Sequence, residues 1–415
     1  MKSLVAFVSL ALLGCAAIWA QTNGRNVGRT GDGTSTSTQQ TTGVSKTSGV
    51  VKTPRGDKTS VASNPVINLA VEKGARWLAS VQGTDGGWGQ DGGDPSNVRL
   101  GAGLESQGND VANTAIAALA LLRAGDQYRP NVERAVGFIL RKVDASPTEG
   151  LAVTDGKQTQ VQRKLGPYID TFVASMLLAQ VDGTFAKATN ARIRSGLQKC
   201  VAKIERNQMK DGSWNVGGGW APLLGTSLAS RSLYAAQQKG IAVDRDVMAR
   251  ADDYTVKNQQ DSIARGRGVG EGRGTAVGPA YGPAIGGVSG SVAVSSAAGV
   301  SLYQDAQALE QLSRTEESRK KNATQIAEIN SKLSDSRFVD GYGSIGGEEF
   351  FSYLNISDGL KRSGGKAWND WHSKITEKIL KLQNEDGTWA GHHCITGRCA
   401  VTSAAILNLT SDRVD

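Results

Sequence analysis

The 415-residue chain has few of the residues that mark several protein classes. It contains four cysteines, nine prolines and three histidines, and aromatic residues make up only 6%. Four cysteines do not form a disulfide scaffold, and nine prolines without a Gly-X-Y period exclude collagen. After the first twenty residues, no apolar stretch reaches the roughly eighteen residues of a membrane span. The net charge of +8 is spread without a basic stripe interleaved with aromatics, so we expect no nucleic-acid partner.

The first twenty residues have the pattern of an export signal. Met1 and Lys2 form a short positive region, residues 4–13 are apolar, and residues 16–20 offer small-residue cleavage positions. We therefore predict a signal peptide at 1–20 and a secreted or periplasmic protein. The residues up to Cys15 also fit a lipoprotein cleavage box, so a lipid anchor at Cys15 is the alternative. Apolar residues continue past Cys15, where a polar tether is expected.

Two segments have a composition that does not favour a packed core. Residues 21–65 are rich in Thr, Ser and Gly, and they predict a disordered linker. Residues 265–299 are rich in Gly and predict a surface insertion within a folded region at 66–415. No Gly-x-Gly-x-x-Gly spacing occurs in this second segment, so a phosphate loop is not expected there.

A sequence motif occurs three times in the folded region. In each copy a tryptophan follows a glutamine by the same offset, and an Asp-Gly pair between them indicates a tight turn at the end of an amphipathic helix. The three pairs are Gln82 and Trp88, Gln208 and Trp214, and Gln383 and Trp389. Such repetition is typical of architectures built from one supersecondary unit.

Charged and apolar helices alternate along the region. The charged helices are expected at 66–82, 130–143, 190–208, 245–259, 317–334 and 372–383. The apolar helices are expected at 110–124, 168–181, 221–238, 297–313, 348–362 and 394–408. This alternation predicts an all-α fold, an (α/α)6 toroid of six helix pairs, in which the apolar helices form the inner ring. All inner helices would run in the same direction, and their N-termini would meet at one mouth.

The motif Lys-Gly-x-x-Trp-Leu-x-x-x-Gln-x-x-x-Gly-x-Trp resembles the Gln-Trp repeat of squalene-hopene and oxidosqualene cyclases. From residue 68 to the C-terminus, the array resembles the α/α toroid shared by terpenoid cyclases and protein prenyltransferase β subunits. The resemblance implies that the six glutamines and tryptophans of the motif clamp neighbouring repeats and are structural.

The resemblance also implies a position for a catalytic acid. Cyclases that begin by protonating an alkene carry Asp-x-Asp-Asp-Thr-Ala, in which the central Asp donates the proton. The closest match here is 110–115, and it places Ala112 at the donor position. A methyl group cannot donate a proton, so we do not expect proton-initiated cyclisation. Whether the protein is an enzyme stays open.

Seven residues are candidates for a site at the mouth: Asp110, Asp170, Glu348, Glu349, His392, His393 and Cys394. Prenyltransferases hold zinc with Asp-x-Cys and His at the starts of two late inner helices, so the resemblance implies a possible zinc site. Its candidate ligands are Glu348, His392, His393 and Cys394. Phe350 stands where that family has its thiolate. Adjacent histidines also serve as helix caps, which is the alternative without a metal.

Three functions remain open at this point. The first is the binding of an apolar ligand or a peptide in the cavity or mouth of the toroid. The second is an enzyme with a divergent mouth site, acting as a zinc-dependent transferase or hydrolase or as a polysaccharide lyase. The third is a structural or interaction module.

Overall fold

The computed structural model describes residues 64–90, 108–154, 159–215, 222–267, 301–341 and 345–413. The chain divides into two units, Met1–Thr59 and Ser60–Asp415, and all described residues belong to the second. The expected signal peptide, residues 21–63 of the expected linker and residues 268–299 of the expected insertion lie outside the described residues.

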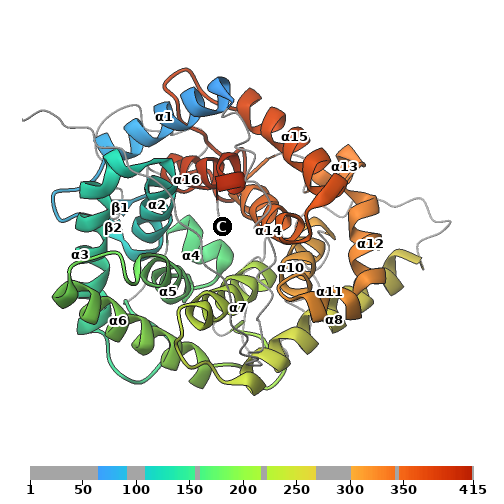
Figure 1. Ribbon diagram of the computed structural model, residues 1–415, viewed down its shortest axis with the longest axis horizontal. Helices are drawn as coiled ribbons and strands as arrows, with labels where there is room; N and C mark the ends of the chain where they lie inside the picture. Colours follow the sequence, from blue (N-terminus) through green and yellow to red (C-terminus); the bar gives the residue numbers. More distant parts are fainter. Residues whose placement is uncertain are drawn as a thin grey trace, which may run out of the picture. The chain divides into compact units, whose positions relative to one another are not determined.

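Helices of the second unit form two concentric rings (Figure 1). The inner helices in the described part of the chain are α2 (Val111–Ala124), α5 (Ile169–Val181), α7 (Pro222–Gln238), α10 (Ser301–Leu312), α14 (Gly347–Ser363) and α16 (Arg398–Leu409). Each inner helix packs against the next one, and α16 packs against α2, so the inner ring is closed. The predicted all-α toroid is confirmed.

The outer ring holds α1 (Pro65–Ser80), α3 (Arg129–Ala145), α6 (Lys187–Arg206), α8 (Arg245–Arg267), α11 (Glu316–Lys321), α12 (Ala323–Lys332) and α15 (Gly365–Lys381). Shorter elements are α4 (Gln160–Leu165), α13 (Ser336–Val339), the 3₁₀ turns Asp126–Tyr128 and Ser411–Arg413, and a two-stranded ladder of β1 (Trp88–Gly89) and β2 (Asn109–Asp110). Within the described residues, no helix is long and apolar enough to cross a membrane.

The structure differs from the sequence-based expectation in three helices. The outer helix expected at 317–334 is divided at Asn322 into α11 and α12. The inner helix expected from residue 394 starts at Arg398, because Cys394 has a φ of 56° that does not fit a helix. The third difference is α8, which extends to Arg267 and so includes the first residues of the expected insertion.

The glutamines of the three motifs make equivalent hydrogen bonds. Each side-chain Nε2 donates to a carbonyl in its own turn and to a carbonyl of the next outer helix. The second acceptors are Asn131 O for Gln82 (2.9 Å), Val247 O for Gln208 (2.8 Å) and Ala70 O for Gln383 (2.9 Å). Because Ala70 is in α1, the Gln383 bond joins the last repeat to the first and fastens the outer ring.

The tryptophans of the motifs are buried and bind their own repeats. Each indole Nε1 donates to the last turns of the preceding outer helix, as in Trp389 to Ile379 O (2.8 Å). Trp88 and Trp214 make the same bond to Leu78 O and Ile204 O. The turn glycines have φ values near +90°, which favour glycine at these positions.

Candidate functional site

The N-terminal ends of the inner helices define one mouth of the ring, and the short helix α4 lies there. It contacts α2, α5 and α7, and Figure 1 shows it within the circle of inner helices. Its last carbonyl, Leu165 O, approaches the backbone of α7 at Gly225, where an added Cβ would lie 2.2 Å away. A glycine is therefore required for this close contact.

Two glutamine side chains fasten α4 across the mouth. Gln160 Nε2 donates to Thr396 Oγ1 (2.9 Å), and Gln160 Oε1 accepts from the backbone amides of Thr396 (2.9 Å) and Gly397 (3.2 Å). Gln162 Nε2 donates to Asp170 at the start of α5 (2.9 Å). Thus α4 connects the segment before α16 with the start of α5.

Asp110 and Asp170 form a buried carboxyl pair at the N-termini of α2 and α5. Asp110 caps α2 by accepting from Asn113 N (2.8 Å), and the backbone amide of Ala112 forms a hydrogen bond with both carboxyls. Burial and the charge of Asp170 raise the pKa of Asp110 to about 7. Burial also raises the pKa of Asp170, against the lowering effect of Thr154 and other donors. Ionisation of both carboxyls at once is therefore disfavoured.

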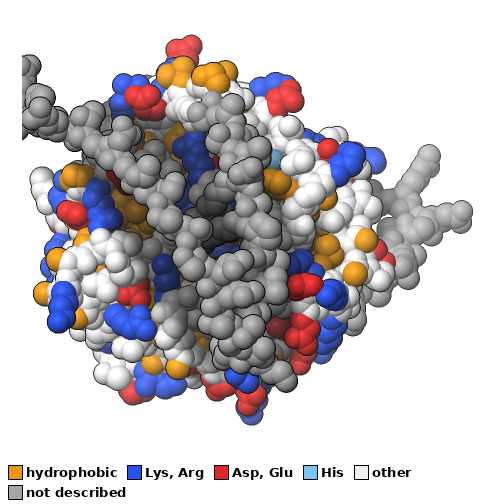
Figure 2. Space-filling model, viewed as in Figure 1, with side chains coloured by type: hydrophobic (Ala, Val, Ile, Leu, Met, Phe, Trp, Pro, Cys, Tyr) orange, Lys and Arg blue, Asp and Glu red, His pale blue; other side chains and the backbone are white. Residues whose placement is uncertain are grey.

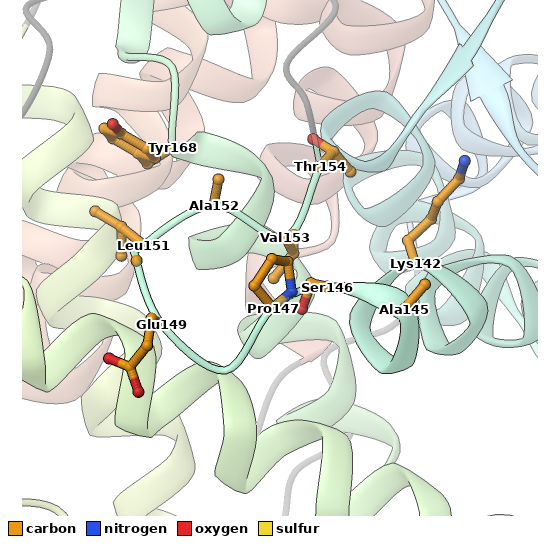
Figure 3. A pocket seen from close by; sticks show the side chains of 11 residues that line it. Lys142, Ala145, Ser146, Pro147, Glu149, Leu151, Ala152, Val153, Thr154 and Tyr168 are labelled. Atoms are coloured by element: carbon orange, nitrogen blue, oxygen red, sulfur yellow. The ribbon is translucent and has the colours of Figure 1, made fainter.

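A pocket of about 430 Å³ lies beside this pair, in the loop of residues 146–154 (Figure 3). Thr154 lines the pocket and donates through Oγ1 to Asp170 (2.5 Å). Lys203 fixes the loop, because its Nζ donates to three carbonyl oxygens of residues 149–152 at 3.0 to 3.1 Å. The pocket is lined by the loop, the end of α3 and Tyr168, so it is a surface feature next to Asp170.

The other candidate residues meet at the start of α14. The ligand atoms of Glu348, His393 and Cys394 lie within 4.8 Å of one another. Glu348 is fully buried in the first turn of α14, and the two other residues belong to the loop before α16. A carboxylate, an imidazole and a thiolate are a donor set that suits zinc.

Glu349 lies behind this group and orients it. Its carboxylate accepts from Tyr303 Oη (2.6 Å) and from Gly346 N (2.8 Å), and it lies 3.4 Å from His393 Nε2. A carboxylate beside one imidazole nitrogen fixes the ring and directs the other nitrogen, as behind many metal-binding histidines. Glu349 is therefore a positioning residue for His393.

Burial and neighbouring negative charges raise the pKa values of Glu348 and Cys394. Burial and the neighbouring Glu349 raise the pKa of Glu348 to about 7. Burial and Glu348 raise the pKa of the Cys394 thiol to about 12. Lys164 of α4 acts in the opposite direction on both groups. A bound cation would reverse these shifts, because it favours the charged carboxylate and thiolate.

The loop of His393 packs directly on the start of α14. A Cβ added to Gly346 would lie 2.6 Å from His393 O and 2.9 Å from His393 Nδ1. A Cβ added to Gly347 would lie 2.6 Å from Ile395 Cγ2. The glycine pair therefore permits the contact that brings His393 to Glu348.

The seven candidate residues thus fall into separate groups. Asp110 and Asp170 pair with each other, and Glu348, Glu349, His393 and Cys394 form the second group. His392 is exposed and is not part of the metal-ligand group. The sequence analysis missed Gln160 and Lys164, although Thr159 and Gln162 form a capping box that signals the start of α4.

Comparisons with known proteins give short matches to squalene-hopene cyclases. Residues 57–153 match the model of the squalene-hopene cyclase C-terminal domain. A squalene–hopene cyclase of Bradyrhizobium diazoefficiens is 41% identical over 71 residues, and a probable squalene–hopene cyclase of Sinorhizobium fredii is 39% identical over 77 residues. The chain is squalene cyclase-like. The resemblance inferred from the repeated motif is confirmed.

The matched part of this squalene cyclase-like chain is short. It covers 17% and 18% of the chain and 10% and 11% of the two relatives, so the chain spans about a tenth of the length of the curated relatives it matches. Two structures of the type II terpene cyclase MstE from Scytonema align with 84% of this chain and 97% of their own. Their TM-scores are 0.33 and 0.34, at 12% and 11% identity.

Proposed function

We propose that this squalene cyclase-like protein is exported and binds zinc at the mouth formed by the N-terminal ends of the inner helices. We propose further that it acts as a zinc-dependent transferase or hydrolase. The observation that carries the proposal is the convergence of Glu348, His393 and Cys394 within 4.8 Å. Three protein ligands with a fourth position left for water or substrate are the usual arrangement of catalytic zinc.

The residues present fit a zinc ion. Tetrahedral zinc needs ligand atoms at about 2.0 to 2.3 Å from the metal, so ligand atoms less than 5 Å apart need little movement. When bound, zinc would polarise an oxygen of the substrate or activate a water molecule. Glu349 would hold His393 in place, and Lys164 would put a positive charge beside Cys394.

The residue at position 112, where the cyclases have their catalytic acid, favours a reaction other than proton-initiated cyclisation. Ala112 is fully buried in the first turn of α2, and its methyl side chain has no acidic proton. Asn113 beside it is held by Asp110 and is not ionisable. A reaction that starts by protonation of an alkene therefore has no donor at this position.

Metal analysis combined with native mass spectrometry tests the zinc proposal. We expect one zinc ion per purified mature chain, loss of the ion in His393→Ala, and full occupancy in His392→Ala. The His392 variant is a matched control because the neighbouring imidazole is exposed and outside the group. Zinc-free wild-type protein after growth and purification with added zinc would refute the proposal.

Binding of an apolar ligand is the second candidate, and two observations favour it. The names of the curated relatives give squalene as their substrate. In addition, Leu119, Leu122 and Met176 on inner helices are only partly buried. The same mass spectra test this candidate, because a bound ligand would add a few hundred daltons that organic solvent removes. Protein with neither zinc nor a ligand would leave a structural or interaction module.

A further inference from the structure

A buried tyrosine of α10 reaches the proposed zinc site from behind. Tyr303 lies in the first turn of α10, and α10 packs on α14, which carries Glu348 and Glu349 in its own first turn. The Tyr303 side chain is 1% exposed, and its Oη donates to Glu349 Oε1 (2.6 Å). A chain of polar contacts therefore leads from α10 through Glu349 to His393.

The two oxygens of the Glu349 carboxylate have different neighbours. Oε1 faces Tyr303, whereas Oε2 accepts from Gly346 N (2.8 Å) and lies 3.4 Å from His393 Nε2. The last side-chain torsion of a glutamate has broad minima, so by itself it does not fix the plane of the carboxylate. The Tyr303 bond holds Oε1 in place and thereby keeps Oε2 directed at His393.

The oxygen opposite Nε2 decides which nitrogen of His393 faces a metal. A neutral imidazole carries its hydrogen on one nitrogen, and an acceptor close to Nε2 favours the form with the hydrogen on Nε2. Nδ1 then keeps its lone pair. It is the nitrogen that would bind zinc together with Glu348 and Cys394.

The hydroxyl of Tyr303 is a permanent donor. Burial and the neighbouring Glu349 raise the pKa of Tyr303 above its ordinary value. The hydroxyl therefore keeps its proton at physiological pH and donates it to the Glu349 carboxylate.

Polar contacts on other faces of α10 fix the helix that presents Tyr303. Asp305 accepts from Lys332 Nζ of α12 (2.7 Å), and Gln307 Nε2 donates to Thr255 Oγ1 of α8 (3.2 Å). Both residues of α10 are buried. Because hydrogen bonds are directional, these contacts oppose rotation of α10 about its axis. The position of the Tyr303 hydroxyl is therefore tied to the outer ring.

We propose that Tyr303 is a positioning residue of the zinc site, which acts through Glu349 to direct His393 Nδ1 at the metal. This role rests on the proposed function, since it needs a zinc ion held by Glu348, His393 and Cys394. It extends the site from the loop before α16 to a third element, α10.

Competition with a chelator of known zinc affinity measures the dissociation constant of zinc for the mature protein and its variants. Tyr303→Phe should weaken zinc binding about tenfold or more, because loss of a partner behind a metal-binding histidine costs about 10- to 100-fold in affinity. In a Glu349→Gln background, Tyr303→Phe should have little further effect, because the two residues act in series.

Tyr353→Phe is the matched control. Tyr353 is also fully buried, but its Oη donates to the backbone carbonyl of Val339 (2.7 Å). Both variants lose one buried hydroxyl, so we expect similar losses of thermal stability, and a loss of zinc affinity only in Tyr303→Phe. Figure 2 shows Asp and Glu side chains interspersed with Lys and Arg on the surface. Both variants keep these side chains, so weak binding of zinc to surface carboxylates cancels in the comparison.

Nitrogen-15 NMR of the histidine rings gives a second readout, with His393 assigned by its absence from the His393→Ala spectrum. In metal-free wild-type protein at pH 8, above the usual histidine pKa of about 6.5, His393 should carry its hydrogen on Nε2. Added zinc should shift the Nδ1 resonance. Hydrogen on Nδ1 would overturn this role alone, as would equal zinc affinity in a folded Tyr303→Phe protein. Wild-type protein that binds no zinc would overturn the proposed function as well.

Discussion

Replacement of Gln383 by alanine should weaken the closure of the outer ring between α15 and α1. The side-chain amide of Gln383 donates to Gly387 O in its own turn and to Ala70 O in α1, both at 2.9 Å. The bond to Ala70 joins the last repeat to the first. Each net hydrogen bond contributes about 0.5 to 1.5 kcal/mol, so the loss of both should lower the free energy of unfolding by about 2 kcal/mol. For a unit of this size that corresponds to a melting temperature lower by roughly 3 °C.

Urea unfolding followed by circular dichroism measures this change. Gln383→Glu is informative because it keeps the size of the side chain but removes both donors, so it should lose at least as much stability as the alanine variant. Gln238→Ala is the control, since Gln238 is exposed at the end of α7. A Gln383→Ala protein within about 0.5 kcal/mol of the wild type would refute the clamp as a source of stability.

Three further predictions follow from the same contacts. The raised pKa of Asp110 means that the folded state holds its proton more tightly than the unfolded state, so stability should fall as pH rises from about 4 to about 7, by at most about 4 kcal/mol. Asp110→Asn should flatten this slope in urea titrations at several pH values, and an unchanged slope would contradict the assignment. Gly346→Ala should displace His393 and reduce bound zinc, measured by metal analysis, whereas Gly137→Ala has no atom within 3.5 Å of its new Cβ and should keep the ion. Lys203→Met should lose three hydrogen bonds and about 3 kcal/mol in thermal unfolding, while Lys210→Met, at an exposed position, should change stability little.

The sequence was sufficient for the two rings because the evidence for them is local. Each Gln-Trp pair specifies one turn, and the apolar or charged character of the next helix follows from its own residues. The seam bond between Gln383 and Ala70 could be expected once the array was recognised as a closed ring, although it joins residues 313 apart. Helix boundaries were less predictable, as the late start of α16 shows.

The geometry of the mouth was not predictable in the same way. The six residues of α4 are too few to show a helical period, and the helix is fastened by Gln160 to residues more than 230 positions away. The choice between His392 and His393 depends on the backbone of the loop, in which Cys394 has a positive φ. The pairing of Arg231 in α7 with Asp358 in α14 likewise has no local signature.

The residues at 110–115 that resemble the cyclase motif have structural tasks in this chain. Thr114 Oγ1 accepts from Trp88 N (2.8 Å), and the other repeats place Thr226 and Thr402 on Trp214 N and Trp389 N in the same way. Asp110 caps α2. The side chain at position 112 makes no such bond, so an alanine there leaves the clamp intact. A partly matching motif therefore indicates the fold of this chain, and its chemistry must be sought at groups that the clamp does not use.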